Sequence, residues 1–148
     1  MKKLLVLMLV SVFITCGCRR KSSVYPQGAW TMVQILVKEN GKSYVSFPTA
    51  TTTGSQHKAW TDSKWMWTAT YEDETGSMEG FGGGSYTLEG TQYVEYVEFI
   101  TAEAYENQTL EMEMEFVDDT LVQSYHPFNE QGKLMDNMLV IEKYIRWE

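Results

Sequence analysis

Apolar and polar residues alternate along most of the chain after Gly28. The clearest stretch is residues 111–116, where glutamates alternate with Met112, Met114 and Phe116. A period of two places the glutamates on one face and the apolar side chains on the other, as in a strand with one solvated face. A helix would spread both classes around its circumference. We therefore predict antiparallel strands and no helix after Gly28.

The same alternation recurs between turns that carry Asn, Asp or Gly, such as Asn40-Gly41 and Asp118-Asp119. It predicts strands near residues 28–38, 43–50, 57–61, 64–72, 84–89, 92–101, 109–117, 120–126 and 138–147. Short strands at regular intervals are typical of a sandwich or a barrel. We expect an all-β fold, an antiparallel up-and-down β-barrel of about eight to ten strands.

Glycine is dense over residues 80–84, where the sequence is Gly-Phe-Gly-Gly-Gly. The segment precedes a predicted strand, whereas a phosphate-binding cradle needs the N-terminus of a helix. We expect a flexible hairpin or a bulge here. The functional alternative is a gating loop over the mouth of a barrel.

The N-terminal segment has a different pattern. A basic start, Met1-Lys2-Lys3, is followed by an apolar run of 11 residues, Leu4–Ile14. The run is short for a membrane span, which needs roughly 20 residues, and it fits the apolar region of a secretory signal. With Gly17 before Cys18, it resembles a bacterial lipoprotein signal, which implies that Cys18 is lipidated. Cys16 is the alternative.

This resemblance implies three parts: a signal peptide (1–17), a lipidated cysteine with a flexible basic tether (18–25), and a barrel domain (26–148). We expect a partner membrane, reached through the lipid anchor, in the bacterial cell envelope. The residues after Cys18 are basic, which favours the periplasmic face. The choice between inner and outer membrane stays open, and the sequence indicates no particular protein partner.

Charge is divided unevenly along the chain. The 148 residues carry 12 basic and 20 acidic side chains, for a net charge of −8. Beyond Ser23 the count is 7 basic and 20 acidic, so the domain carries −13. Such acidity argues against binding to nucleic acid, which needs a basic surface. An aromatic content of 14% argues against a disordered chain.

A family resemblance rests on both ends of the domain. Gly28-Ala29-Trp30 opens the first strand and Arg146 ends the last, which resembles the Gly-x-Trp motif and terminal arginine of lipocalins and their calycin relatives. Residues 83–98 and 141–147 are similar to uncharacterised bacterial lipocalin-like lipoproteins. The resemblance implies a barrel floor that Trp30 closes and Arg146 covers. The chain is short beside the large lipocalins, which argues against a spacious cavity.

The pair of Trp30 and Arg146 also has a physical reason. A guanidinium over an indole face gains roughly 0.5–2 kcal/mol. A contact between the first and last strands is what barrel closure requires. We therefore predict that both residues are structural.

Two strand faces carry carboxylates among apolar residues. They are Tyr93, Glu95, Val97 and Phe99 on one face, and Val140, Glu142, Tyr144 and Arg146 on the other. If Arg146 reaches the floor, Glu142 points inward, and Glu95 is inward by alternation. Buried carboxylates need partners. Glu95 and Glu142 then either bond to Tyr, Trp or Arg in the core or recognise the polar group of a ligand.

Aromatic residues gather at Trp60, Trp65, Trp67 and Tyr71. They either pack as core or line a pocket for a flat or apolar ligand. We predict the following ligand-binding set: Trp67 and Tyr125 for stacking, and Tyr93, Glu95 and Glu142 for polar recognition.

Candidate chemistry is sparse. The two histidines, His57 and His126, fall short of the three protein ligands of a catalytic zinc site, and no Gly-x-Ser-x-Gly motif occurs. We expect no metal, no cofactor, no catalytic residue and no enzyme activity. The predicted function is non-catalytic binding of a small apolar or aromatic ligand. The alternative is a structural or protein-interaction lipoprotein whose barrel is filled by side chains.

Overall fold

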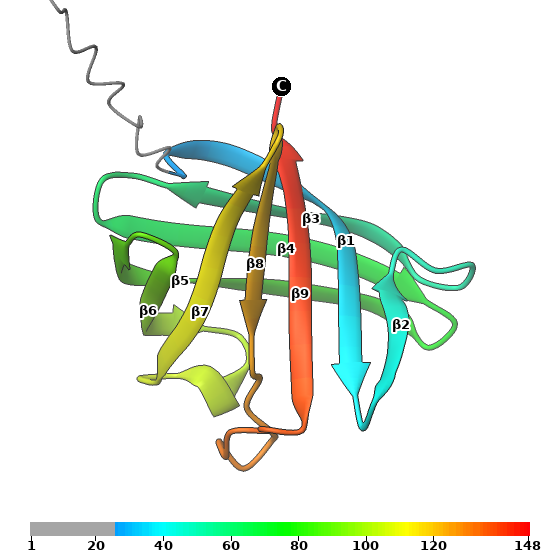
Figure 1. The fold of residues 1–148 in the computed structure, drawn as a ribbon. Coiled ribbons are helices and arrows are strands. Elements are labelled where there is room, and N and C mark those ends of the chain that lie inside the picture. Colours follow the sequence, from blue (N-terminus) through cyan, green and yellow to red (C-terminus); the bar gives the residue numbers. More distant parts are fainter. Residues whose placement is uncertain (1–25) are drawn as a thin grey trace, which may run out of the picture.

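A computed structural model describes residues 26–148 (Figure 1). The predicted signal peptide, Cys16, Cys18 and the predicted tether up to residue 25 lie outside the described residues. The elements in chain order are β1 (Gly28–Glu39), β2 (Lys42–Phe47), β3 (Thr53–Trp60), β4 (Lys64–Asp73), β5 (Gly76–Glu89), β6 (Gln92–Ile100), the short 3₁₀ helix η1 (Glu103–Tyr105), β7 (Thr109–Val117), β8 (Thr120–Tyr125) and β9 (Met138–Arg146). Within residues 26–148, no helix is long and apolar enough to cross a membrane.

The strands form one closed antiparallel barrel (Figure 1). Each strand from β3 to β9 pairs with the next, and β9 pairs with β1. The other edge of β1 is divided, because its first residues pair with β3 and its last residues pair with β2. Eight strands therefore close the barrel and β2 is an extra strand at its edge. The predicted all-β, up-and-down barrel is confirmed.

The glycine-rich segment lies within a strand at a bulge, so the predicted bulge is confirmed, whereas the segment forms neither a flexible hairpin nor a gating loop. β5 begins at Gly76 and runs through residues 80–84, and its pairing with β6 shifts register between Gly83 and Gly84. Gly82 lies opposite Trp67 of β4, and a Cβ on Gly82 would lie 2.7 Å from Nε1 of that indole. A Cβ on Gly80 would also lie 2.7 Å from the same ring. The glycines let the indole lie against the strand.

The register shift also changes the face of one predicted inner residue. Gly84 pairs with Val97 and Gly83 pairs with Phe99, so Glu98 is an extra residue in β6. An extra residue turns the side chains that follow it to the opposite face. Val97 is accordingly buried, whereas Phe99 is 45% exposed. The prediction that Phe99 shares the inner face of Glu95 is wrong.

The end of the barrel beside the C-terminus is closed by Trp30 and Arg146. The two residues pair across β1 and β9, and the guanidinium carbon lies 4.0 Å from the centre of the indole ring. The indole is buried and donates to the Pro26 carbonyl oxygen at 2.6 Å. Gly28 has a φ of +104°, and a Cβ there would lie 2.6 Å from Nη1 of Arg146. The glycine of the Gly-x-Trp motif thus makes room for the arginine.

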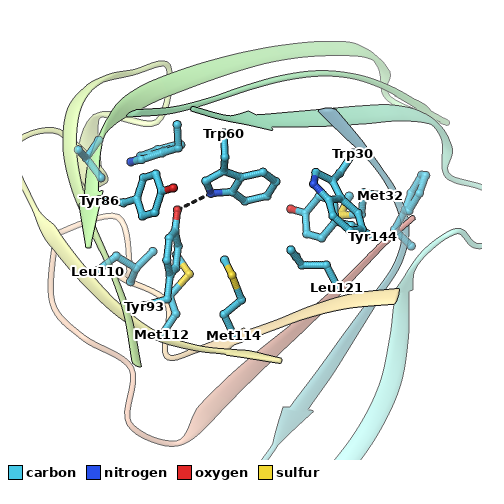
Figure 2. Packing of buried hydrophobic residues seen from close by; sticks show 13 residues of the cluster. Trp30, Met32, Trp60, Tyr86, Tyr93, Leu110, Met112, Met114, Leu121 and Tyr144 are labelled. Atoms are coloured by element: carbon cyan, nitrogen blue, oxygen red, sulfur yellow. Dashed lines mark hydrogen bonds between the residues drawn. The ribbon is translucent and has the colours of Figure 1, made fainter. Parts of the chain in front are cut away.

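Large side chains fill this half of the barrel (Figure 2). The ring of Trp30 lies 5.9 Å from that of Phe116, and the ring of Trp60 lies 6.1 Å from that of Tyr144. Met32, Met114 and Leu121 belong to the same buried cluster. The half that ends at Trp30 is therefore packed as a core.

Candidate functional site

A cavity of about 210 Å³ lies inside the barrel, toward the other end. Its lining residues are Gln56, Lys58, Trp65, Trp67, Glu95, Val97, Ile100, Ala102, Tyr105, Leu110, Met112, Tyr125 and Glu142. Tyr105 comes from η1, and its hydroxyl accepts the backbone N–H of Phe128 at 3.1 Å. The two rings are 5.4 Å apart. Figure 1 shows η1 and the β8–β9 connection at this end, opposite the C-terminus.

A buried ion pair forms one side of the polar interior. Lys58 Nζ of β3 lies 2.6 Å from Glu95 Oε1 of β6, and the two side chains are 5% and 3% exposed. Lys58 also donates to Gln123 Oε1 at 3.2 Å. The Tyr93 hydroxyl donates to Glu95 at 2.7 Å. It also accepts from Trp60 Nε1 at 2.7 Å, and Figure 2 draws this second bond. Both charges are thus paired and hydrogen-bonded, as burial requires.

Aromatic rings surround this ammonium group. Lys58 Nζ lies 5.0 Å from the ring centre of Trp65 and 5.2 Å from that of Trp60. Such contacts offset part of the cost of removing the charge from water. Burial raises the pKa of the Glu95 carboxyl, against the opposing effects of Lys58 and of the hydrogen bond from Tyr93. Desolvation therefore outweighs the favourable partners at this carboxyl.

A second network ends at Glu142 of β9. The Tyr144 hydroxyl donates to Glu142 Oε2 at 2.6 Å, and the Tyr125 hydroxyl donates to Oε1 at 3.0 Å. Gln56 Nε2 donates to the Tyr144 hydroxyl at 2.8 Å, and the Tyr71 hydroxyl donates to Gln56 Oε1 at 2.9 Å. Burial, and then the charge of Glu142, raise the pKa of Tyr71, Tyr125 and Tyr144. These phenols therefore stay neutral donors at ordinary pH.

The polar interior is fully bonded. In the part of the chain that the structure describes, no buried side-chain nitrogen or oxygen lacks a hydrogen-bond partner. Its buried polar or charged residues are Gln56, Lys58, Glu95, Gln123 and Glu142. A complete network of this kind fixes the positions of its members, since each lost bond would leave a buried polar group unpaired.

Four of the five predicted ligand-binding residues line the cavity: Trp67, Glu95, Tyr125 and Glu142. Tyr93 does not line it, because its side chain is completely buried and its hydroxyl lies between Trp60 and Glu95. Tyr93 positions Glu95 instead. The binding roles themselves stay predictions.

Sequence reasoning missed Lys58, Gln56 and Tyr105. Gln56, Lys58 and Trp60 lie two residues apart, so alternation places them on the same face of a strand. This spacing could have predicted that Lys58 and Gln56 point inward with Trp60, although the predicted strand began only at residue 57. Tyr105 lies in a single turn of 3₁₀ helix between β6 and β7. Nothing periodic in the sequence marks such a turn.

The histidines lie away from the cavity. The ring of His57 stacks on that of Trp147 at 4.3 Å, and His126 Nδ1 lies 2.6 Å from the Met138 carbonyl oxygen. Among residues 26–148, no group of three or more His, Cys, Asp or Glu side chains is arranged to hold a metal ion. The polar and aromatic groups of the cavity are therefore one ammonium, two carboxylates, one amide, two phenols and two indoles.

No protein-family model matches this chain, and a search of curated proteins finds no match either. The closed antiparallel barrel is compatible with the lipocalin-like fold that the sequence resemblance implies.

Proposed function

We propose that this protein is a lipid-anchored envelope protein whose barrel binds a small molecule without catalysis. The observation that carries the proposal is the cavity of about 210 Å³, in which aromatic rings and a few polar groups face the same space. That combination is typical of small-molecule sites. The closed barrel supports it further, since such barrels hold one small ligand where side chains leave room.

The size of the cavity limits the ligand. Sites for drug-sized molecules have volumes of about 300–1,000 Å³, and a cavity of about 150 Å³ is enough for benzene. A cavity of about 210 Å³ lies between these values. We therefore expect a ligand of one ring with a short substituent, or an aliphatic molecule of similar size.

The anchor rests on the sequence of residues 1–25. Gly17-Cys18 after an apolar run resembles a lipoprotein signal, and a protein with several acyl chains binds membranes stably. We expect Cys18→Ser to move the protein from the membrane fraction to the soluble fraction of the producing bacterium. Cys16→Ser is the matched control and should leave it on the membrane. The opposite result would assign the anchor to Cys16, and no shift with either variant would overturn the anchoring proposal.

Native mass spectrometry of the protein purified from the organism that encodes it tests the binding proposal. We expect a retained small molecule that is released on denaturation. Ala102→Trp, at an exposed position that lines the cavity, should abolish retention. Ala50→Trp is the control, since Ala50 is exposed in the β2–β3 connection. Repeated recovery of an empty, folded barrel would overturn the proposal.

The second candidate is a structural or protein-interaction lipoprotein without a ligand. The dense packing around Trp30, Trp60 and Leu121 favours it, as does a cavity below the usual range for ligand sites. An empty barrel that repeatedly carries the same partner protein in the mass spectrometry experiment would select this function.

A further inference from the structure

The charges buried in the barrel do not balance. Among residues 26–148, the buried charged side chains are Lys58, Glu95 and Glu142. Lys58 and Glu95 neutralise each other at 2.6 Å. The other ion pair of the described residues, Lys64 with Glu98, is exposed. One carboxylate, that of Glu142, is therefore left inside the barrel without a cation.

Phenols surround the carboxyl of Glu142. Both of its oxygens accept a phenolic hydrogen, from Tyr125 and from Tyr144. The Tyr144 hydroxyl accepts from Gln56, which in turn accepts from Tyr71. This network joins two phenols directly, and an amide and a third phenol indirectly, to Glu142, and none of these members among residues 26–148 is a cation. The carboxyl of Glu142 is therefore held by neutral donors.

Aromatic side chains line the cavity beside this carboxylate. Trp67, Tyr105 and Tyr125 line the same cavity as Glu142. Ring faces attract a cation, and the attraction grows when water is excluded. A buried charge without an opposite charge is costly. A cationic ligand would supply the missing positive charge and bind the faces of the rings, whereas an anionic ligand would place a second negative charge beside Glu142.

Resting on the proposed function, we propose that the cavity binds a small organic monocation, an ammonium with one short apolar or aromatic group. The ammonium lies against Glu142, and the apolar part lies against Trp67 and Tyr105. The Lys58–Glu95 pair stays intact, since its ammonium already has a carboxylate and an amide oxygen as partners. One positive charge on the ligand makes the interior neutral.

A charge series on the full-length protein in detergent tests the proposal. Phenethylamine, phenethyl alcohol and hydrocinnamate are similar in size and differ in charge. Binding is measured by titration calorimetry and by tryptophan fluorescence. We expect phenethylamine to bind at least about tenfold more tightly than the alcohol, because a hydrogen bond between charged groups is stronger than one between neutral groups. Hydrocinnamate should bind most weakly.

Glu142→Gln should remove the preference for the amine over the alcohol. The glutamine oxygen still accepts a phenolic hydrogen, but the charge is gone. Glu113→Gln makes the same change in net charge on the exposed side of β7, and it should keep the preference. Should Glu142→Gln not fold, the ligand series on the unaltered protein decides alone.

The outcomes distinguish the proposal of a cationic ligand from the proposal that the barrel binds a small molecule at all. Equal binding of amine and alcohol, or tighter binding of hydrocinnamate, overturns the cation assignment and leaves ligand binding intact. If none of the three binds, the charge of the molecule retained in native mass spectrometry decides: a monocation supports the assignment, and any other charge overturns it. Absence of both binding and a retained molecule overturns the proposed function together with this inference.

Discussion

The two ends of the barrel interior are built from different chemistry. At the end beside the C-terminus, the ring of Trp30 packs at a tilt against that of Phe116, and the rings of Trp60 and Tyr144 meet edge to face. Arg146 covers the ring of Trp30. Toward the other end, the interior holds an ion pair, an unpaired carboxylate and a cavity of about 210 Å³. The strands that form the two ends are the same, since every barrel strand contributes to one continuous sheet.

The difference indicates that the two ends of one sheet have separate roles, one in stability and the other in positioning polar groups. Apolar packing gives the free energy of folding with little chemical specificity. Buried polar groups contribute little net stability and fix a precise arrangement when all are bonded. We infer that the closed end keeps the barrel folded, so that the cavity end can hold groups suited to a ligand. Three of the four predictions below perturb one end or the other, and the fourth perturbs an exposed ion pair.

Alkaline pH should destabilise the cavity end, because buried tyrosines ionise there, and should thereby unfold the whole barrel. Burial raises the pKa of five tyrosines, namely Tyr71, Tyr93, Tyr105, Tyr125 and Tyr144. Their contribution to stability is complete below the unfolded pKa of about 10 and is lost as the pH rises toward the folded values. Phenolate absorbance and tryptophan fluorescence should then change in one cooperative step. Gradual ionisation of all the tyrosines in a folded protein would contradict this.

Trp30→Ala should produce the largest effect of any single substitution at the closed end. Truncation of a buried aromatic residue costs about 3–5 kcal/mol, and the contact with Arg146 is lost as well. We expect a loss of about 5 kcal/mol in urea unfolding, whatever ligand is present. Trp147→Ala is the control, because Trp147 is 57% exposed, and it should change far less. Equal effects would refute the role of Trp30 as the floor.

Lys58→Met should cost about 4 kcal/mol, because it leaves Glu95 buried without its cation. The double variant Lys58→Met/Glu95→Leu should recover most of this loss, since apolar pairs of similar size often replace buried ion pairs without cost. Urea unfolding of the single and double variants checks both statements. A double variant no more stable than the single one would show that the cavity end depends on the ions themselves.

The strands were predictable because their signals are local. Alternation over residues 111–116 marks β7, and the left-handed φ angles of Asn40 (49°) and Gly41 (77°) suit the hairpin that their sequence predicts. The pairing of Trp30 with Arg146 followed from the resemblance and from the need to close a barrel. The inward direction of Glu142 followed from its parity with Arg146.

The remaining features depend on contacts between distant strands. Phe99 faces outward because Glu98 forms a bulge against β5, and single-strand alternation cannot show a bulge. The glycine segment is a strand paired with β4, and its glycines leave room for the indole of Trp67. Lys58 lies inside because Glu95 of another strand neutralises it. Cavity volume depends on how all side chains pack, and therefore no local pattern predicts it.

Lys64→Met should have the smallest effect of the four, and it isolates burial as the cause of the differences above. Lys64 Nζ lies 2.5 Å from Glu98 Oε1, close to the 2.6 Å of the buried pair, but the side chains are 57% and 49% exposed. The hydrogen bond from Lys64 lowers the pKa of Glu98, so any contribution of this pair to stability is present at neutral pH and disappears as the pH falls.

Water replaces the partner that Lys64→Met removes, and in the unaltered protein salt screens the attraction between the two charges. The midpoint of urea unfolding should therefore shift by a small fraction of the shift that Lys58→Met causes, and by less still at high salt. A shift as large as that of Lys58→Met would mean that the contact itself, and not its burial, determines how much an ion pair contributes to the free energy of unfolding. The contrast between the two ends would then need another explanation.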